Sequence, residues 1–565
     1  MYTGVYNSWL ENTIENEEIY SELKSINGKE KEIEDRFYKE LDFGTAGLRG
    51  VIGAGTNRMN IYTVGKATQG LAQFLLGSCK HTPKVAIAYD SRKNSLLFAE
   101  YSASVLGANG IKVFLYKTLM PTPMLSYAVR ALGCDSGIVI TASHNPAQYN
   151  GYKVYGSSGF QITDHDAAAI TGFIKKTDIW NDVKYESLSD LLEREIVQYI
   201  SQDVIEDYYN EIYKCKVTPD DLSNINIVYT PLNGTGNIPV RTVLNHYNIG
   251  TINIVKEQEN PDATFATCVY PNPENIDAIQ LGLKLSKITK SDILLSTDPD
   301  CDRCGVAVRH GCDYIQLTGN QIGVLMLNFI CSVKGDAVKN GTAVKSIVST
   351  ELASCIANDY GIKLKNVLVG FKYIGEIITN LEDEGRADEF VLGFEESCGY
   401  LSGIHSRDKD AVNASLLICE MTSFYKKQGK DLIDVLNDIY AKYGFYLDKV
   451  DNYQFEGVEG EKKMKEMIAI INEKSNIDDC GYKTLFMENY SKSIRVENGF
   501  VSKLDLPVSN VIRFGLNDGT AITVRPSGTE PKIKLYYSIK AQDENAANEK
   551  YYVFQKYMKG IMGIE

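Results

Sequence analysis

A serine followed at once by a histidine, in Thr141-Ala142-Ser143-His144-Asn145-Pro146, is the group best suited to chemistry in this chain. The residues before it, 136–140, are rich in β-branched side chains and predict a buried strand. Ser143 would then follow the end of a strand, where α/β sheets carry their ligand-binding loops. A serine hydroxyl there can be a nucleophile or carry a phosphoryl group when a base and positive charge lie nearby. The alternative is an ordinary turn with an Asx-type hydrogen bond.

Three carboxylates at alternate positions, Asp298, Asp300 and Asp302, follow an apolar strand-like run at 293–295. Like charges this close repel one another unless a cation holds them together, and hard oxygen ligands suit Mg²⁺ or Mn²⁺. Arg303 adds a fixed positive donor suited to phosphate. The alternative, a solvated acidic loop, is disfavoured because the carboxylates come directly after a strand. A metal site is therefore expected here.

The same loop contains a Cys-x-x-Cys pair, Cys301 and Cys304. No second pair stands at zinc-finger spacing, so a structural zinc site is not expected. Two incidental thiols are the favoured interpretation, and a redox role is the alternative.

Two further loops carry groups that match sugar or phosphate. Glu395 and Ser397 follow the strand predicted at 390–392, and a carboxylate with a hydroxyl can both accept from and donate to sugar hydroxyls. Arg525 is followed by hydroxyls and a flexible glycine, a set that can surround a phosphate dianion. Solvated turns are the alternative for both loops. The residues of the second set are Arg525, Ser527, Gly528 and Thr529.

Two lysines, Lys372 and Lys409, are predicted to lie in loops of the third α/β region. A lysine beside a bound phosphate can hold it as a point charge or move a proton. Exposed charge with no further role is the alternative.

The elements that must position these groups alternate between strand and helix, which predicts mostly parallel sheets covered by helices. Residues 1–40 are predicted as charged helices and 41–55 as a glycine-rich loop. From about residue 445 strands precede one terminal helix, which predicts a smaller α+β domain. The predicted strands are 84–89, 112–116, 225–229, 292–296, 344–349, 367–369, 390–392, 493–496, 509–514, 521–524 and 532–538, and the predicted helices are 95–106, 122–132 and 544–558.

Composition limits the classes of function. The chain has 565 residues, 44% of them hydrophobic, and a formal net charge of -14, which argues against general nucleic-acid binding. The amino-terminal segment lacks the basic and apolar regions of a signal peptide, and no apolar run reaches the roughly 20 residues of a membrane span. Twelve cysteines scattered through a chain of this size favour reduced thiols in a cytoplasmic protein.

Taken together and in this order, the motifs resemble the α-D-phosphohexomutase family. The match runs from Gly44-Thr45-Ala46-Gly47-Leu48-Arg49-Gly50 to the Arg525 loop, so it covers nearly the whole chain. The phosphoglucomutase and phosphopentomutase branch is the most similar. The segments behind that narrower resemblance are Asn150-Gly151-Tyr152-Lys153-Val154-Tyr155, Gly370-Phe371-Lys372-Tyr373-Ile374-Gly375 and Gly393-Phe394-Glu395-Glu396-Ser397.

The resemblance implies an α/β fold of four domains, heart-shaped around a central cleft. Three similar α/β domains with mixed, mostly parallel sheets would precede the smaller C-terminal α+β domain. The expected domains are 1–210 with the N-terminal helices and the phosphoserine loop, 211–318 with the metal-binding loop, 319–443 with the sugar-recognition loop and 444–565 with the phosphate-binding loop.

The resemblance also implies roles for single residues. Ser143 would be the phosphoserine, and one Mg²⁺ would bind Asp298, Asp300, Asp302 and a Ser143 phosphate oxygen. Glu395 and Ser397 would contact sugar hydroxyls. The residues expected near the transferred phosphoryl group are Arg49, His144, Lys153 and Lys409, and those expected to bind the substrate's phosphates are Arg303, Lys372, Arg525, Ser527, Gly528 and Thr529.

The implied reaction is the interconversion of α-D-glucose 1-phosphate and glucose 6-phosphate through glucose 1,6-bisphosphate, which would also serve as activator. A pentose or mannose phosphate as substrate, and a bisphosphate synthase that uses a glycolytic phosphoryl donor, stay open as alternatives. A non-catalytic sugar-phosphate sensor is a further alternative, disfavoured because Ser143 and the three aspartates are all present. The expected partners are small sugar phosphates, with no nucleic acid and no membrane.

Overall fold

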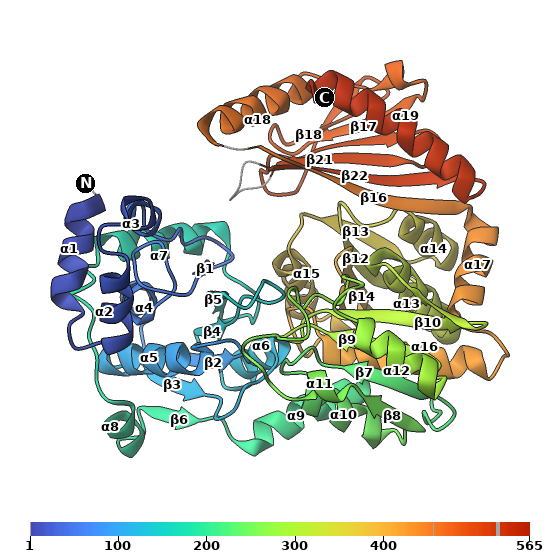
Figure 1. Ribbon diagram of the computed structural model, residues 1–565. Coiled ribbons are helices and arrows are strands. Elements are labelled where there is room, and N and C mark those ends of the chain that lie inside the picture. Colours follow the sequence, from blue (N-terminus) through green and yellow to red (C-terminus); the bar gives the residue numbers. More distant parts are fainter. Residues whose placement is uncertain (1, 456, 527–531, 565) are drawn as a thin grey trace. The chain divides into compact units, whose positions relative to one another are not determined.

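The computed structural model describes residues 2–455, 457–526 and 532–564 (Figure 1). The chain divides into two compact units. The first contains Met1–Leu317, Ile374–Phe390 and Gly399–Lys427, and the second contains Thr318–Tyr373, Val391–Cys398 and Gln428–Glu565.

Three short helices open the first unit and confirm the predicted helical N-terminus. They are α1 (Tyr2–Asn12), α2 (Glu17–Ser25) and α3 (Glu30–Phe37). They pack around Trp9, whose ring meets Phe37 and Trp180 edge-on, with ring centroids 5.7 and 5.3 Å away. The charged residues of these helices are largely exposed, so the apolar stripe around Trp9 holds them to the unit.

The first sheet of this unit has six strands and mixed directions. Four strands are parallel neighbours. The strand after the Ser143 loop pairs antiparallel with one of these four, and the outermost strand pairs antiparallel with it in turn. The prediction of a loop throughout 41–55 is wrong in part, because 48–51 pair with that strand. In spatial order the strands are β1 (Leu48–Val51), β5 (Tyr149–Gly156), β4 (Ser136–Ile140), β2 (Lys84–Tyr89), β3 (Lys112–Leu115) and β6 (Val197–Tyr199). The accompanying helices are α4 (Ile61–Ser78), α5 (Ser95–Ala108), α6 (Thr122–Ala131), α7 (Asp164–Lys176), α8 (Leu188–Glu193) and α9 (Gln202–Lys214).

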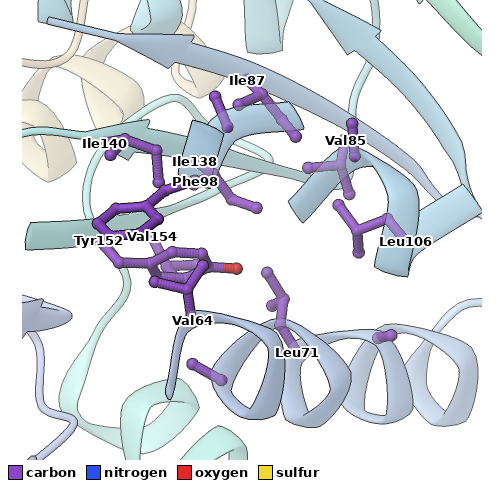
Figure 2. Packing of buried hydrophobic residues seen from close by; sticks show 14 of the residues in the cluster. Val64, Leu71, Val85, Ile87, Phe98, Leu106, Ile138, Ile140, Tyr152 and Val154 are labelled. Atoms are coloured by element: carbon purple, nitrogen blue, oxygen red, sulfur yellow. The ribbon is translucent and has the colours of Figure 1, made fainter. Parts of the chain in front are cut away.

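The core of this sheet explains why its strands form where the apolar runs predict them. Figure 2 shows Ile138 and Ile140 of β4 beside Val154 of β5, with Val64 and Leu71 of α4 facing them. All five side chains are buried, so the β-branched residues lose water contact by standing on a covered sheet. This packing makes β4 a firm base for the loop that carries Ser143.

The second sheet of the first unit has five strands. A parallel group of three is extended by an antiparallel hairpin, and the Asp298 loop joins the two parts. In spatial order the strands are β11 (Asp313–Gln316), β10 (Cys304–His310), β9 (Ile293–Thr297), β7 (Asn226–Thr230) and β8 (Thr251–Ile254). The first unit also contains α10 (Asn237–His246), α11 (Lys256–Glu259), α12 (Gln280–Thr289), η2 (Ala387–Glu389), the short strand β15 (Gly399–Leu401) and α16 (Ala411–Lys426).

The second unit begins with a further α/β layer, in which β13 (Lys363–Val367), β12 (Thr342–Ser346) and β14 (Phe390–Glu395) lie in that order. The strands predicted at 344–349 and 367–369 are displaced. The sequence of β13, Lys-Leu-Lys-Asn-Val, is half exposed and alternates in polarity, so its apolar signal is weak. The helices here are α13 (Gly319–Lys334), η1 (Gly335–Val338), α14 (Leu352–Tyr360), α15 (Phe371–Asp383), which continues into the first unit, and α17 (Leu432–Tyr443).

One helical segment of the described chain, Gly319–Val338, is long and apolar enough to pass the test for a membrane-spanning helix, and 56% of it is buried inside the protein. It contacts α14 and α17, as a core helix of the second unit does.

A seven-stranded sheet, antiparallel throughout, completes the second unit and confirms the predicted C-terminal α+β region. In spatial order its strands are β16 (Phe445–Gln454), β22 (Lys532–Ala541), β21 (Ala521–Pro526), β20 (Ile512–Leu516), β17 (Thr484–Asn489), β18 (Ile494–Glu497) and β19 (Phe500–Lys503). The helices are α18 (Gly457–Asn472), η3 (Asp478–Cys480) and α19 (Glu544–Met562).

Candidate active site

Ser143 lies in the loop between β4 and β5 and points its hydroxyl at a carboxylate. The Ser143 Oγ donates to Asp298 Oδ2 at 2.8 Å and lies 3.2 Å from His144 Nδ1. Its backbone has a φ of 51°, which is uncommon for a residue other than glycine, and its N–H donates to Thr141 Oγ1. Strained backbone of this kind persists where the surroundings fix it, and it concentrates at functional sites.

Arg92 fixes these surroundings. The Arg92 guanidinium is buried and donates to four carbonyl oxygens of the Ser143 loop, including those of Pro146 at 2.9 Å and Tyr149 at 3.1 Å. Asp90 pairs with Arg92 at 3.4 Å, and both side chains are fully buried. Since a guanidinium presents several donors in a rigid plane, Arg92 holds the loop by its backbone.

The three aspartates are brought together as predicted. Asp298, Asp300 and Asp302 are buried, and one oxygen of each lies within 4.8 Å of the others. The loop begins where β9 ends, and the N–H groups of Asp302 and Arg303 donate to Asp298 Oδ1 at 3.1 and 3.0 Å. Asp300 Oδ1 and Asp302 Oδ1 are buried without a hydrogen-bond partner.

The electrostatics of the triad fit a divalent cation. Burial raises the pKa of Asp298 well above its usual range, and the neighbouring Asp300 and Asp302 raise it further. For Asp300, burial also acts upward, but Lys153, Asp298 and Lys409 together outweigh it and the pKa is lowered. Three carboxylates thus lie close together out of water with two oxygens unbonded, and hard oxygen donors of this kind suit Mg²⁺ or Mn²⁺.

Two predicted lysines, Lys153 and Lys409, also lie at the triad. The Lys153 ammonium is 2.8 Å from Asp300 Oδ2, and that of Lys409 is 3.1 Å from Asp302 Oδ2. Burial acts to lower the pKa of Lys153, but Asp300 and Asp302 reverse this and raise it. Gly399 leaves space for Lys409, because a Cβ at Gly399 would stand 2.2 Å from the lysine Cδ.

The remaining predicted residues of the first unit add positive charge around Ser143. Arg303 lies 3.6 Å from Glu274 Oε2 and 3.8 Å from Asp302 Oδ1, while Arg49 is exposed and reaches Asn145 Oδ1 at 3.5 Å. Burial, followed by Arg303 and Arg49, lowers the pKa of the half-buried His144 well below its ordinary value. A neutral imidazole beside several cations is an environment suited to an anion such as phosphate.

Apart from Arg303, the predicted sugar and phosphate residues belong to the second unit. Glu395 ends β14 and accepts a hydrogen bond of 2.7 Å from the Gly370 N–H, and Ser397 follows, partly buried, in the next turn. Burial raises the pKa of Tyr536 to about 12, with Glu396 and Glu395 contributing in the same direction, while a hydrogen bond from Arg525 opposes them. Within this unit Arg525 and Glu395 therefore both influence the pKa of the same tyrosine, Tyr536.

One prediction for this unit is wrong, and another falls on residues that the structure does not describe. Lys372 lies in the first turn of α15, so its predicted place in a loop is wrong; its ammonium lies 4.9 Å from the centroid of the Tyr373 ring. Ser527, Gly528 and Thr529 lie outside the described residues.

Several residues of the site were not predicted from the sequence. Thr122 donates to Asp300 Oδ2 at 3.0 Å, and the Tyr155 hydroxyl donates to Asp408 Oδ2 at 2.6 Å, beside Lys409. Arg92 was not predicted either, although Asp90-Ser91-Arg92 follows β2 just as Ser143 follows β4. Because β2 and β4 are parallel neighbours, their carboxyl ends meet, and this signal could have identified Arg92.

Models of four consecutive domains match this chain. They describe the phosphoglucomutase/phosphomannomutase α/β/α domains I, II and III at residues 40–179, 206–311 and 318–443, and the C-terminal domain at 458–553. A phosphoglucomutase of Staphylococcus epidermidis is 37% identical over 88% of this chain and 90% of its own length.

Solved structures agree on the fold. A putative phosphomannomutase from Thermus thermophilus has a TM-score of 0.66 at 22% identity and covers 92% of this chain and 99% of its own. The open form of the Paramecium phosphoglucomutase pp63/parafusin has a TM-score of 0.65 at 19% identity, with 93% and 96% covered. With four domain models matched along its length, this chain belongs to the phosphoglucomutase/phosphomannomutase family of α-D-phosphohexomutases.

Proposed function

We propose that this protein is a phosphoglucomutase that interconverts α-D-glucose 1-phosphate and glucose 6-phosphate through a phosphoserine at Ser143. The observation that carries the proposal is the position of the Ser143 hydroxyl, 2.8 Å from Asp298 and 3.2 Å from His144, an imidazole whose pKa is lowered by Arg303, Arg49 and Lys153 in addition to burial. The name and length of the staphylococcal relative support glucose phosphate as the substrate.

In the proposed cycle the phosphoryl group of Ser143 passes to a free hydroxyl of the sugar monophosphate. The product is glucose 1,6-bisphosphate, which turns over and returns its other phosphoryl group to Ser143. Phosphoryl transfer depends mainly on positioning and on stabilising the charge that spreads over the transferred group. Lys153, Lys409 and Arg49 are placed to provide that charge.

His144 is the residue best placed to accept the proton of the attacking sugar hydroxyl. Its lowered pKa keeps the imidazole neutral near pH 7, and Nδ1 lies 3.2 Å from the Ser143 oxygen. Lys153 has a raised pKa and stays protonated, so it is suited to hold charge and not to remove a proton.

Asp298, Asp300 and Asp302 would hold Mg²⁺, together with an oxygen of the phosphate on Ser143. The ion would neutralise charge on the transferred group. The two unbonded carboxylate oxygens of the triad support this assignment.

For the second unit we propose that Glu395 and Ser397 contact sugar hydroxyls. Arg525, with Ser527, Gly528 and Thr529, would hold the phosphate that does not react, and Lys372 would add positive charge. The shared neighbourhood of Glu395 and Arg525 at Tyr536 supports one substrate for both groups. All twelve cysteines are free thiols, in keeping with the proposed cytoplasmic location.

The test is an assay with Mg²⁺ and a catalytic amount of glucose 1,6-bisphosphate. Glucose 1-phosphate, mannose 1-phosphate and ribose 1-phosphate are offered side by side, and the Ser143→Ala variant is the control. Fast turnover of the glucose ester alone, lost in the variant, is the expected result. Preference for the ribose or mannose ester would replace the substrate assignment, and full activity of Ser143→Ala would contradict the phosphoserine mechanism.

A further inference from the structure

Three side chains of different chemistry meet at the end of the first sheet opposite Ser143. Cys79 follows α4, His81 lies in the loop before β2, and Asp135 directly precedes β4. One ligand atom of each lies within 4.8 Å of the other two. Since the five residues of β4 span about 16 Å, this cluster lies far from the phosphoryl-transfer site.

The cluster brings three metal-binding atom types close together, and part of it is already held in place. His81 Nε2 lies 3.0 Å from Asp135 Oδ1, and Asp135 Oδ2 accepts the N–H of Lys84 at 2.9 Å. The backbone bond holds the carboxylate in place, while the His81 side chain is 64% exposed and can turn toward an ion. In a tetrahedral zinc site, ligand atoms about 2.0 to 2.3 Å from the ion stand about 3 to 4 Å apart, a spacing that small side-chain rotations reach here.

We propose that Cys79, His81 and Asp135 bind a zinc-class divalent ion, with a fourth position open to water. A thiolate, an imidazole and a carboxylate are the three donor types that Zn²⁺ uses in proteins, whereas Mg²⁺ takes oxygen donors only. A cavity of about 290 Å³ borders Cys79 and Asp135, which gives the fourth position access to solvent.

The proposed ion would stabilise the first unit. It would join the end of α4 to the starts of β2 and β4, which already pair with each other in the sheet. Binding to the folded state alone would raise the thermal unfolding temperature as the concentration of the ion rises. It takes no part in the proposed phosphoryl transfer, so the mutase rate with Mg²⁺ should not depend on it.

Cobalt titration of the full chain tests the site, because Co²⁺ bound to a thiolate gives a charge-transfer band and tetrahedral Co²⁺ absorbs strongly in the visible. Oxygen ligands at the Asp298 triad give no thiolate band, so the two sites are distinguishable. Cys79→Ser should abolish the band, and His81→Ala should weaken binding at least tenfold, since even outer-shell changes cost about 10- to 100-fold. The exposed Cys312 supplies the matched control, Cys312→Ser, which should keep the band.

The thermal shift caused by Zn²⁺ gives a second readout that does not depend on activity. The wild type and Cys312→Ser should be stabilised more than His81→Ala, an exposed position whose change should not disturb folding. Absence of a thiolate band, its survival in Cys79→Ser, or equal affinity in His81→Ala would overturn the proposal.

Discussion

Each unit buries a cluster of charges, and the two clusters differ in how those charges are compensated. In the second unit Glu351 lies 2.9 Å from both Lys345 and Arg513, and Arg513 reaches Glu488 at 2.9 Å. Burial raises the pKa of Glu351, but Lys345 and Arg513 outweigh it and bring the pKa to about 2. In the first unit the pKa of Asp298 moves the other way, because burial raises it and the neighbouring Asp300 and Asp302 add to the rise, while Arg303 only opposes them.

The contrast separates a structural network from a reactive one. Glu351 and its partners form a closed set of opposite charges that joins strands of the second unit. The Asp298 triad keeps two oxygens without a hydrogen-bond partner, although Lys153 and Lys409 contact two of its carboxylates. A buried cluster that keeps unbonded carboxylate oxygens is a better marker of function than one in which each carboxylate contacts a cation.

The largest expected effect separates activity from stability in the triad. Asp298→Asn should lower mutase turnover by about a thousandfold or more, because it removes one of the three carboxylates at the reacting serine. It should not destabilise the metal-free protein, since it relieves repulsion from Asp300 and Asp302. Turnover assays and denaturant unfolding in a chelator check this; a loss of several kcal/mol in stability would place the triad with the structural networks.

The opposite substitution in the second unit is Glu351→Gln. It removes the carboxylate that pairs with the buried Lys345 and with one side of the buried Arg513 guanidinium. This loss should cost about 3 kcal/mol of unfolding free energy. Turnover per folded molecule should stay near that of the wild type. Urea unfolding followed by far-UV circular dichroism measures the loss, and unchanged stability would remove the distinction between the clusters.

Arg92 offers a third kind of buried charge, paired with Asp90 yet placed to position the reacting loop. Arg92→Lys keeps the charge but loses the planar set of donors to the loop carbonyls, so kcat should fall about a hundredfold with a smaller change in KM. A change in KM alone, with kcat intact, would show that Arg92 does not position Ser143.

The last expected effect, a stability change small per pH unit, is a pH dependence in the loop before α16. Burial acts to lower the pKa of His405, but hydrogen bonds with Asp410 and Cys215 raise it to about 10. The folded state therefore holds this proton where the unfolded state, with a pKa near 6.5, has released it. The stabilisation is complete below about pH 6.5 and is lost as the pH rises toward 10.

Unfolding free energies measured by urea titration between pH 7 and 9.5 test this sign. The wild type should lose up to about 1.4 kcal/mol per pH unit through His405. His405→Gln, though less stable at pH 7, should show a shallower slope. Parallel slopes for the two proteins would exclude His405 as the titrating group.

The sequence predicted the parts of the molecule whose signals are local. The apolar runs of β2, β4 and β9 and the polar loops that follow them identified Ser143 and the aspartates. Pairing between Ser143 and Asp298 joins loops of two different sheets, which periodicity cannot connect, and only the family resemblance implied it. The position of the half-exposed strand β13 was predicted wrongly, because its alternating lysines hide the apolar pattern of a strand.

The central claim is that Ser143 carries the phosphoryl group, and labelled glucose 1,6-bisphosphate tests it most directly. After incubation, peptide mapping should find the label on the peptide that contains Ser143, and unlabelled glucose 1-phosphate should remove it at the rate of turnover. The Ser143→Ala variant should take up no label. Label on another residue, or label on Ser143 that substrate does not remove, would contradict the account.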